Sequence, residues 1–134
     1  MSEIEKIFSE NGCIEKSLPS YEKRDVQIEM AKSVEKCLET GETLLVEAGT
    51  GVGKSLAYLL PLVIWAVRNN KRAVVSTYTK ALQNQLFIKD IPFVRKTTNL
   101  DFKFALCLGS ENYLCLRKVD KFDGESLSEK SKKE

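Results

Sequence analysis

A glycine-rich segment between two apolar runs constrains the fold of this chain more than any other feature. Residues 47–55 read Glu-Ala-Gly-Thr-Gly-Val-Gly-Lys-Ser, and they lie between the apolar runs 43–46 and 56–67. The pattern predicts a buried strand, then a turn whose glycines let backbone N–H groups approach one anion, then a buried helix. The free N–H groups and positive dipole end of that helix favour a phosphate at the same point. The segment therefore predicts a phosphate-binding loop at a strand-to-helix junction.

The residues of this loop predict the binding of a nucleotide with Mg²⁺. The Lys54 ammonium can reach the β- and γ-phosphates, which makes it the candidate catalytic residue, and the Ser55 hydroxyl can complete the shell of a Mg²⁺ ion. The strict pattern has glycine where this chain has Ala48, and a small residue is tolerated there. A plain glycine-rich turn is the alternative, but a turn requires neither the lysine nor the serine. The candidate nucleotide-binding residues of the loop are Ala48, Gly49, Thr50, Gly51, Val52, Gly53, Lys54 and Ser55.

Composition excludes several other functions. The 134 residues carry a net charge of +2 and no histidine, so histidine acid–base chemistry and histidine metal sites are excluded. The charged segment 1–6 has no signal-peptide core, and the apolar run 56–67 is too short to span a bilayer. We therefore expect a cytoplasmic protein with no membrane contact. Its four cysteines form no close pair and should be reduced, with Cys37 and Cys107 packed in the core.

The order of the expected elements predicts an α/β fold. Apolar periodicity favours helices over 4–8, 25–38, 56–67 and 81–88, the last ending before Pro92, and a short helical segment over 113–119. Short apolar runs favour strands over 43–46, 72–76 and 102–108. A strand, a crossover helix and a second strand predict a parallel sheet with a right-handed crossover. We expect residues 1–120 to form a small parallel sheet flanked by helices, and residues 121–134 to be a polar, disordered tail.

Four features occur in an order that resembles the N-terminal part of the first motor domain of DinG-type helicases. Arg24 and Gln27 precede the loop, the segment 76–86 follows the second expected strand, and the segment 109–115 follows the third. These helicases belong to the XPD-like, iron–sulfur branch of superfamily 2. The resemblance implies a partial RecA-like P-loop NTPase domain. For the parent protein it implies ATP-dependent unwinding of DNA, or 5′-to-3′ translocation on single-stranded DNA.

The resemblance also implies roles for residues that precede the loop. Gln27 matches the glutamine that recognises adenine, and an amide suits the N7 and N6 positions of that base because it both donates and accepts. Arg24 matches an arginine near the same pocket. A glutamine on an exposed helix surface is the alternative for Gln27. Tyr21 could stack on the base, and packing on the core is an equal alternative.

The segment 76–86 resembles the motif that contacts single-stranded DNA in these motors. Its hydroxyl groups and the start of the next helix can bind phosphate oxygens without reading bases. A threonine N-cap on a surface helix is the alternative, and capping can coexist with phosphate binding. The candidate nucleic-acid contacts are Thr77, Thr79, Lys80 and Gln83.

Two parts of the family pattern do not occur in this chain. Cys115 matches the first of four cysteines that hold a [4Fe–4S] cluster, but the other three have no match, so the cluster is expected in the full-length parent only. Hydrolysis requires a carboxylate pair after a later strand, and no Asp-Glu pair follows 72–76 or 102–108. We therefore expect an N-terminal fragment, without the C-terminal part of the helicase, that binds ATP and Mg²⁺ but does not turn over. A non-catalytic P-loop module and a small P-loop kinase are the alternatives.

Overall fold

The computed structural model describes residues 3–18, 20–115 and 119. The chain divides into two compact units, Met1–Phe104 and Ala105–Glu134. The polar tail expected over residues 121–134 lies outside the described residues. Among the helices that are described, none is long and apolar enough to cross a membrane.

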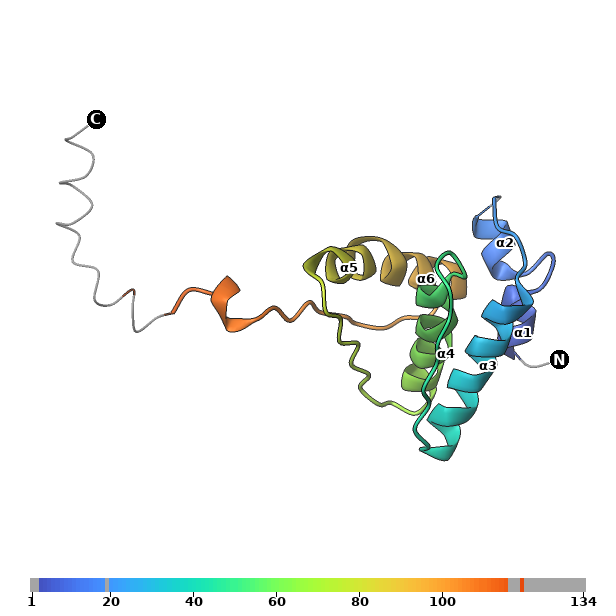
Figure 1. The fold of residues 1–134 in the computed structure, drawn as a ribbon, viewed down its shortest axis with the longest axis horizontal. Helices are drawn as coiled ribbons and strands as arrows, with labels where there is room; N and C mark the ends of the chain where they lie inside the picture. The colour runs from blue at the N-terminus through green and yellow to red at the C-terminus, as the bar shows by residue number, and fades with distance from the viewer. Residues whose placement is uncertain (1–2, 19, 116–118, 120–134) are drawn as a thin grey trace. The chain divides into compact units, whose positions relative to one another are not determined.

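The first unit is built from helices (Figure 1). α3 and α4 pack against each other, α1 packs on α2 and α3, and α6 contacts both α2 and α4. The π-helical turn η1 joins α5 directly to α6 and also contacts α4. The bounds are α1 Glu3–Phe8, α2 Cys13–Ser17, α3 Asp25–Thr40, α4 Lys54–Arg68, α5 Lys80–Gln85, η1 Leu86–Asp90 and α6 Ile91–Thr98.

An apolar core lies between these helices. Ile4 and Phe8 of α1 and Ile14 of α2 are completely buried, as are Leu60 of α4 and Val94 of α6. Burying an isoleucine, leucine or phenylalanine side chain stabilises a fold by about 1.5–3 kcal/mol relative to leaving it exposed. The core therefore ties the N-terminal helices to the helix that follows the glycine-rich loop.

The expected parallel sheet is wrong for the part of the chain that the structure describes. The segments 43–46, 72–76 and 102–108 have no regular secondary structure, and Leu45 and Val74 are 96% and 89% exposed. An α-helix closes its hydrogen bonds within one segment, whereas a strand needs a second strand beside it. The helices can therefore form from local sequence and pack together, while the three extended segments remain without a ladder.

The helix expected over 81–88 continues past Pro92, against the prediction that it ends before this residue. Helical structure runs from Lys80 through η1 to Thr98. Pro92 lies in the first turn of α6, directly after the π-helical turn η1. The helices expected over 25–38 and 56–67 are confirmed as α3 and α4.

The second unit is described over residues 105–115 and at residue 119. It contains the 3₁₀ turn η2, Ser110–Asn112, and the Leu108 N–H donates to the Tyr113 hydroxyl at 3.0 Å. Cys107 is exposed, so its expected place in the core is wrong. Residues 113–115 are not helical, and 116–118 of the expected helical segment lie outside the described residues.

Candidate nucleotide-binding site

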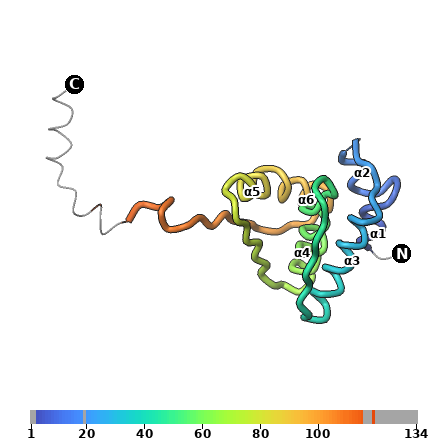
Figure 2. Tube along the Cα trace, in the orientation of Figure 1, coloured from blue at the N-terminus to red at the C-terminus, as the bar shows by residue number. Residues whose placement is uncertain are grey.

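The glycine-rich loop lies at the start of α4. The chain leaves α3, runs back to the first turn of α4 and enters the helix there (Figure 2). Gly51 and Gly53 have φ values of 80° and 82°, in the left-handed region that favours glycine. The Gly53 carbonyl accepts the first helical bond of α4, from the Ala57 N–H at 3.2 Å. The sequence therefore placed the loop correctly at a helix N-terminus, although the strand before it is absent.

Lys54 lies across the loop. Its ammonium donates to the carbonyl oxygens of Ala48 at 2.9 Å and Gly49 at 2.5 Å. Within the described residues no carboxylate is within ion-pair distance of this ammonium. An ammonium has three donors, so one remains after the two loop bonds. The loop thus holds a cation whose charge no neighbouring carboxylate neutralises.

Ser55 is bonded to a side chain one turn further along α4. Its hydroxyl makes a hydrogen bond with Tyr58. Burial raises the pKa of the Tyr58 phenol, the Ser55 bond lowers it, and the nearby Asp90 carboxylate raises it. Asp90 is itself buried and accepts from Gln85 Nε2 at 3.0 Å. Tyr58 therefore stays a neutral phenol that can orient the Ser55 hydroxyl.

Two residues that precede the loop in sequence hold it from the side of α3. Gln27 Nε2 donates to the Gly53 carbonyl at 2.9 Å, and Arg24 Nη1 donates to the Gly51 carbonyl. Gln27 is only 3% exposed. The structure therefore brings Gln27 and Arg24 to the loop, in contact with its backbone carbonyl groups. A base could reach the Gln27 amide only after the loop or its neighbours move.

The residues expected to contact nucleic acid gather at the start of α5. Thr79 caps this helix, with its hydroxyl accepting from the Leu82 N–H at 3.2 Å, and the Gln83 N–H donates to the Thr79 carbonyl at 3.0 Å. The Thr77 hydroxyl donates to the same carbonyl at 3.4 Å. Lys80 begins the helix. The capping alternative therefore describes the contacts of Thr79 in this structure.

Cys115 and the loop belong to different units of the chain. Cys115 is exposed and reduced, and the described residues contain no group of three or more metal-ligating side chains.

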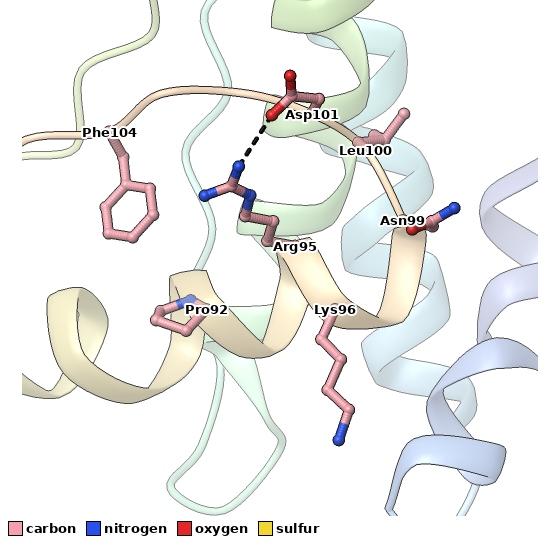
Figure 3. A pocket seen from close by; sticks show the side chains of 7 residues that line it. All are labelled: Pro92, Arg95, Lys96, Asn99, Leu100, Asp101 and Phe104. Carbon is pink, nitrogen blue, oxygen red and sulfur yellow. Dashed lines mark hydrogen bonds and ion pairs between the residues drawn. The ribbon is translucent and has the colours of Figure 1, made fainter.

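A cavity of about 420 Å³ lies beside the end of α6 and contains no residue of the loop. Arg95 spans it to bond Asp101 at 2.8 Å, and Lys96 points away from that pair (Figure 3). The glycine-rich loop itself is closed by the Lys54 bonds to its own carbonyl groups. This cavity is therefore not where the candidate phosphate-binding groups meet. Its lining residues are Pro92, Arg95, Lys96, Asn99, Leu100, Asp101 and Phe104.

Sequence reasoning missed Tyr58 and left the role of Tyr21 open. Tyr58 lies three residues after Ser55 on a helix, and this spacing places two side chains on one face. The spacing could therefore have predicted that Tyr58 lies beside Ser55. The Tyr21 hydroxyl lies 3.3 Å from Gln27 Oε1 and 3.4 Å from the Phe8 carbonyl, a contact that no short-range pattern reveals.

Comparison with known proteins adds the family. The DEAD/DEAH box helicase family matches residues 24–123. The chain is 40% identical over 119 residues to the ATP-dependent DNA helicase YoaA of Haemophilus influenzae, covering 89% of this chain and 18% of the relative. It is 52% identical over 101 residues to the ATP-dependent helicase DinG of Mycobacterium tuberculosis, covering 72% of this chain and 15% of the relative.

A third relative is named for a different activity. The chain is 37% identical over 103 residues to the 3′-5′ exonuclease DinG of Bacillus subtilis, covering 77% of this chain and 11% of the relative. No solved structure matches the chain significantly. The chain spans less than a fifth of the length of these relatives. The family match over residues 24–123 includes Arg24, Gln27, the loop and the segment 76–86. The chain therefore belongs to the DEAD/DEAH box helicase family, and among its members it is similar to DinG and YoaA.

Proposed function

We propose that this chain binds Mg-ATP through residues 48–55, as the nucleotide-binding part of an ATP-dependent DNA helicase of the DinG type. The observation that carries the proposal is the position of Lys54. Its uncompensated ammonium lies across a loop that ends at the N-terminus of a fifteen-residue helix. A cation, a helix dipole and unpaired backbone N–H groups at one point favour a bound phosphate.

The loop residues fit the phosphates and the metal ion. A bound triphosphate offers better acceptors than the neutral carbonyl groups of Ala48 and Gly49, because bonds between charged partners are stronger than those to neutral groups. Lys54 can therefore exchange its loop bonds for phosphate oxygens. Ser55 would hold Mg²⁺, with Tyr58 positioning its hydroxyl. When bound, Mg²⁺ would supply positive charge that offsets the negative charge of the phosphates.

Adenine recognition is assigned to Gln27, with Arg24 beside it. A glutamine amide has two N–H groups and two lone pairs on its oxygen. In this structure one N–H serves the Gly53 carbonyl and one lone pair faces the Tyr21 hydroxyl. One donor and one acceptor are left, which is the combination that the N7 and N6 positions of adenine require. Because Gln27 is only 3% exposed, the loop or its neighbours must move before a base can reach these groups.

Single-stranded DNA is the proposed nucleic-acid partner, and the start of α5 is the proposed contact. The Thr77 and Thr79 hydroxyls with Lys80 and Gln83 supply side chains that can bind phosphate oxygens, and none of them needs to read a base. The support is that the match to the helicase family includes this segment, and that relatives of the chain are DNA helicases.

Binding without turnover is proposed for these 134 residues. The sequence has no adjacent Asp-Glu pair to complete the Mg²⁺ shell and orient a water. ATP hydrolysis, unwinding and the [4Fe–4S] cluster at Cys115 are proposed for the full-length helicase only.

Isothermal titration of the 134-residue chain with Mg-ATP tests the proposal. Lys54→Ala removes the cation of the loop and should weaken binding by about 1.5–3 kcal/mol, the range for a hydrogen bond to a charged group. Lys96→Ala is the matched control, because Lys96 is an exposed lysine on α6 without a described ion pair. Its affinity should equal that of the wild type. Equal affinities of wild type and Lys54→Ala, or no binding to the folded wild type, would refute the proposal.

A further inference from the structure

The Tyr21 hydroxyl connects the first helix to the phosphate loop through one glutamine. Tyr21 lies in the connector between α2 and α3, and its hydroxyl oxygen is 3.4 Å from the Phe8 carbonyl and 3.3 Å from Gln27 Oε1. Both neighbours are acceptors, and a phenol has one proton, so the hydroxyl donates to one of them at a time. Burial raises the pKa of Tyr21, and the Arg24 charge only partly opposes this, so the proton stays in place at neutral pH.

This hydroxyl decides which end of the Gln27 amide faces the loop. With Oε1 toward Tyr21, Nε2 points at the Gly53 carbonyl and donates to it at 2.9 Å. A flipped amide would set two oxygen acceptors, Gln27 Oε1 and the Gly53 carbonyl, against each other. At 3% exposure Gln27 has little water to replace the lost bond, so the phenol favours one orientation.

The Gln27 amide in turn restrains the first turn of α4. The Gly53 carbonyl accepts both from Gln27 Nε2 and from the Ala57 N–H. A Cβ atom placed on Gly53 would lie well inside 3.0 Å of Nε2, so the amide fills the space beside this residue. Lys54 and Ser55 follow directly, and their direction depends on the geometry at Gly53.

We infer that Tyr21 is a positioning residue of the phosphate loop, which acts through Gln27 to hold Gly53 and the first turn of α4. The inference rests on the proposed nucleotide binding for its functional meaning. The Tyr21 hydroxyl arranges the loop before a ligand arrives, which lowers the ordering that binding requires. Tyr21 therefore acts through its hydroxyl and not as a platform for the base.

The test uses the full 134-residue chain with Tyr21→Phe, Gln27→Ala and the double variant. Tyr21→Phe keeps the ring and removes only the hydroxyl. Tyr113→Phe is the matched control, because it removes a phenol that also makes one backbone hydrogen bond, in the other unit of the chain. The first measurement is amide hydrogen exchange of Ala57 by NMR without nucleotide, and the second is the Kd for Mg-ATP.

Tyr21→Phe should speed exchange at Ala57 and weaken Mg-ATP binding by about three- to tenfold each, the effect of losing one hydrogen bond. The double variant should match Gln27→Ala alone, because both changes break the same connection. Tyr113→Phe should behave as wild type. A purely structural role of the Tyr21 ring would leave Tyr21→Phe unchanged in both measurements.

Two results would overturn the inference: unchanged Ala57 exchange in Tyr21→Phe, or effects of Tyr21→Phe and Gln27→Ala that multiply in the double variant. Failure of the proposed function has a different signature. If exchange responds as expected while no variant and no wild type binds Mg-ATP, the positioning of the loop by Tyr21 is supported and nucleotide binding is refuted.

Discussion

The three glycines of the loop should differ in their tolerance of alanine, because their surroundings differ. Gly49 has no positive φ and open space around it, so Gly49→Ala should change the free energy of unfolding by less than about 0.5 kcal/mol or raise it slightly. Gly51 has open space but a φ of 80°, so Gly51→Ala should cost about 1 kcal/mol for the left-handed conformation. Gly53→Ala adds a clash with Gln27 to the same backbone cost.

The additional cost at Gly53 can be worked out from its contact. An alanine Cβ would displace Gln27 Nε2 from the Gly53 carbonyl. Losing one hydrogen bond costs about 1 kcal/mol, and leaving a buried amide without its partner costs about as much again. With the backbone cost of about 1 kcal/mol, Gly53→Ala should therefore destabilise the chain by about 3 kcal/mol in total.

Urea unfolding followed by the fluorescence of Trp65 measures this series, because Trp65 is the single tryptophan and lies on α4. A Gln27→Ala background supplies the control. With the amide gone, the clash is gone, and Gly53→Ala should cost only the ~1 kcal/mol of its backbone conformation. Equal losses for Gly49→Ala and Gly53→Ala, or an unchanged loss in the Gln27→Ala background, would show that Gln27 does not fill this space.

Two further predictions concern Gln27 and Glu35. Gln27→Ala should reduce the preference for ATP over GTP more than it reduces binding of inorganic triphosphate, which competition titrations can measure; a full preference in the variant would remove adenine recognition from this residue. Burial, and then the negative charges of Glu39 and Glu3, raise the pKa of Glu35 above its ordinary value of 4.5, although the Arg68 charge opposes this. Because the pKa of Glu35 is higher in the folded than in the unfolded chain, protonated Glu35 contributes to the free energy of unfolding below pH 4.5. This contribution is lost as the pH rises through the folded-state pKa. Glu35→Gln should therefore raise the urea midpoint at pH 7 and have little effect below pH 4.5; a lower midpoint at pH 7 would contradict the sign.

The two long helices α3 and α4 were predictable from sequence and the strands were not, for a physical reason. α3 and α4 carry a helical apolar period, and each closes its own backbone bonds. The runs 43–46 and 72–76 have the composition of strands, but a strand forms only against a partner at the correct register. No local pattern supplies that partner, and Leu45 and Val74 are exposed as a result.

The candidate site was also predictable from sequence only in part. Ser55 and Lys54 could be placed at a helix N-terminus because they follow the glycines directly in sequence. The bonds of Arg24 to Gly51 and of Gln27 to Gly53 join residues 27 and 26 positions apart. The resemblance to DinG-type helicases assigned these residues to the candidate nucleotide site. Only the structure shows that their partners are loop carbonyl groups.

The two arms of the loop are held unequally, and this determines where it can open. Gly51 and Gly53, on the side of α4, are held by Arg24 and Gln27, and the first turn of a well-packed helix follows them. Ala48 and Gly49, on the other side, are held by the Lys54 ammonium alone among the described side-chain bonds. Within the described residues, the arm of Ala48 and Gly49 thus depends on one side chain and the arm of Gly51 and Gly53 on two. If Mg-ATP binds as proposed, the exchange of the two Lys54 bonds for phosphate oxygens would free Ala48 and Gly49 and leave Gly51 and Gly53 bonded to Arg24 and Gln27.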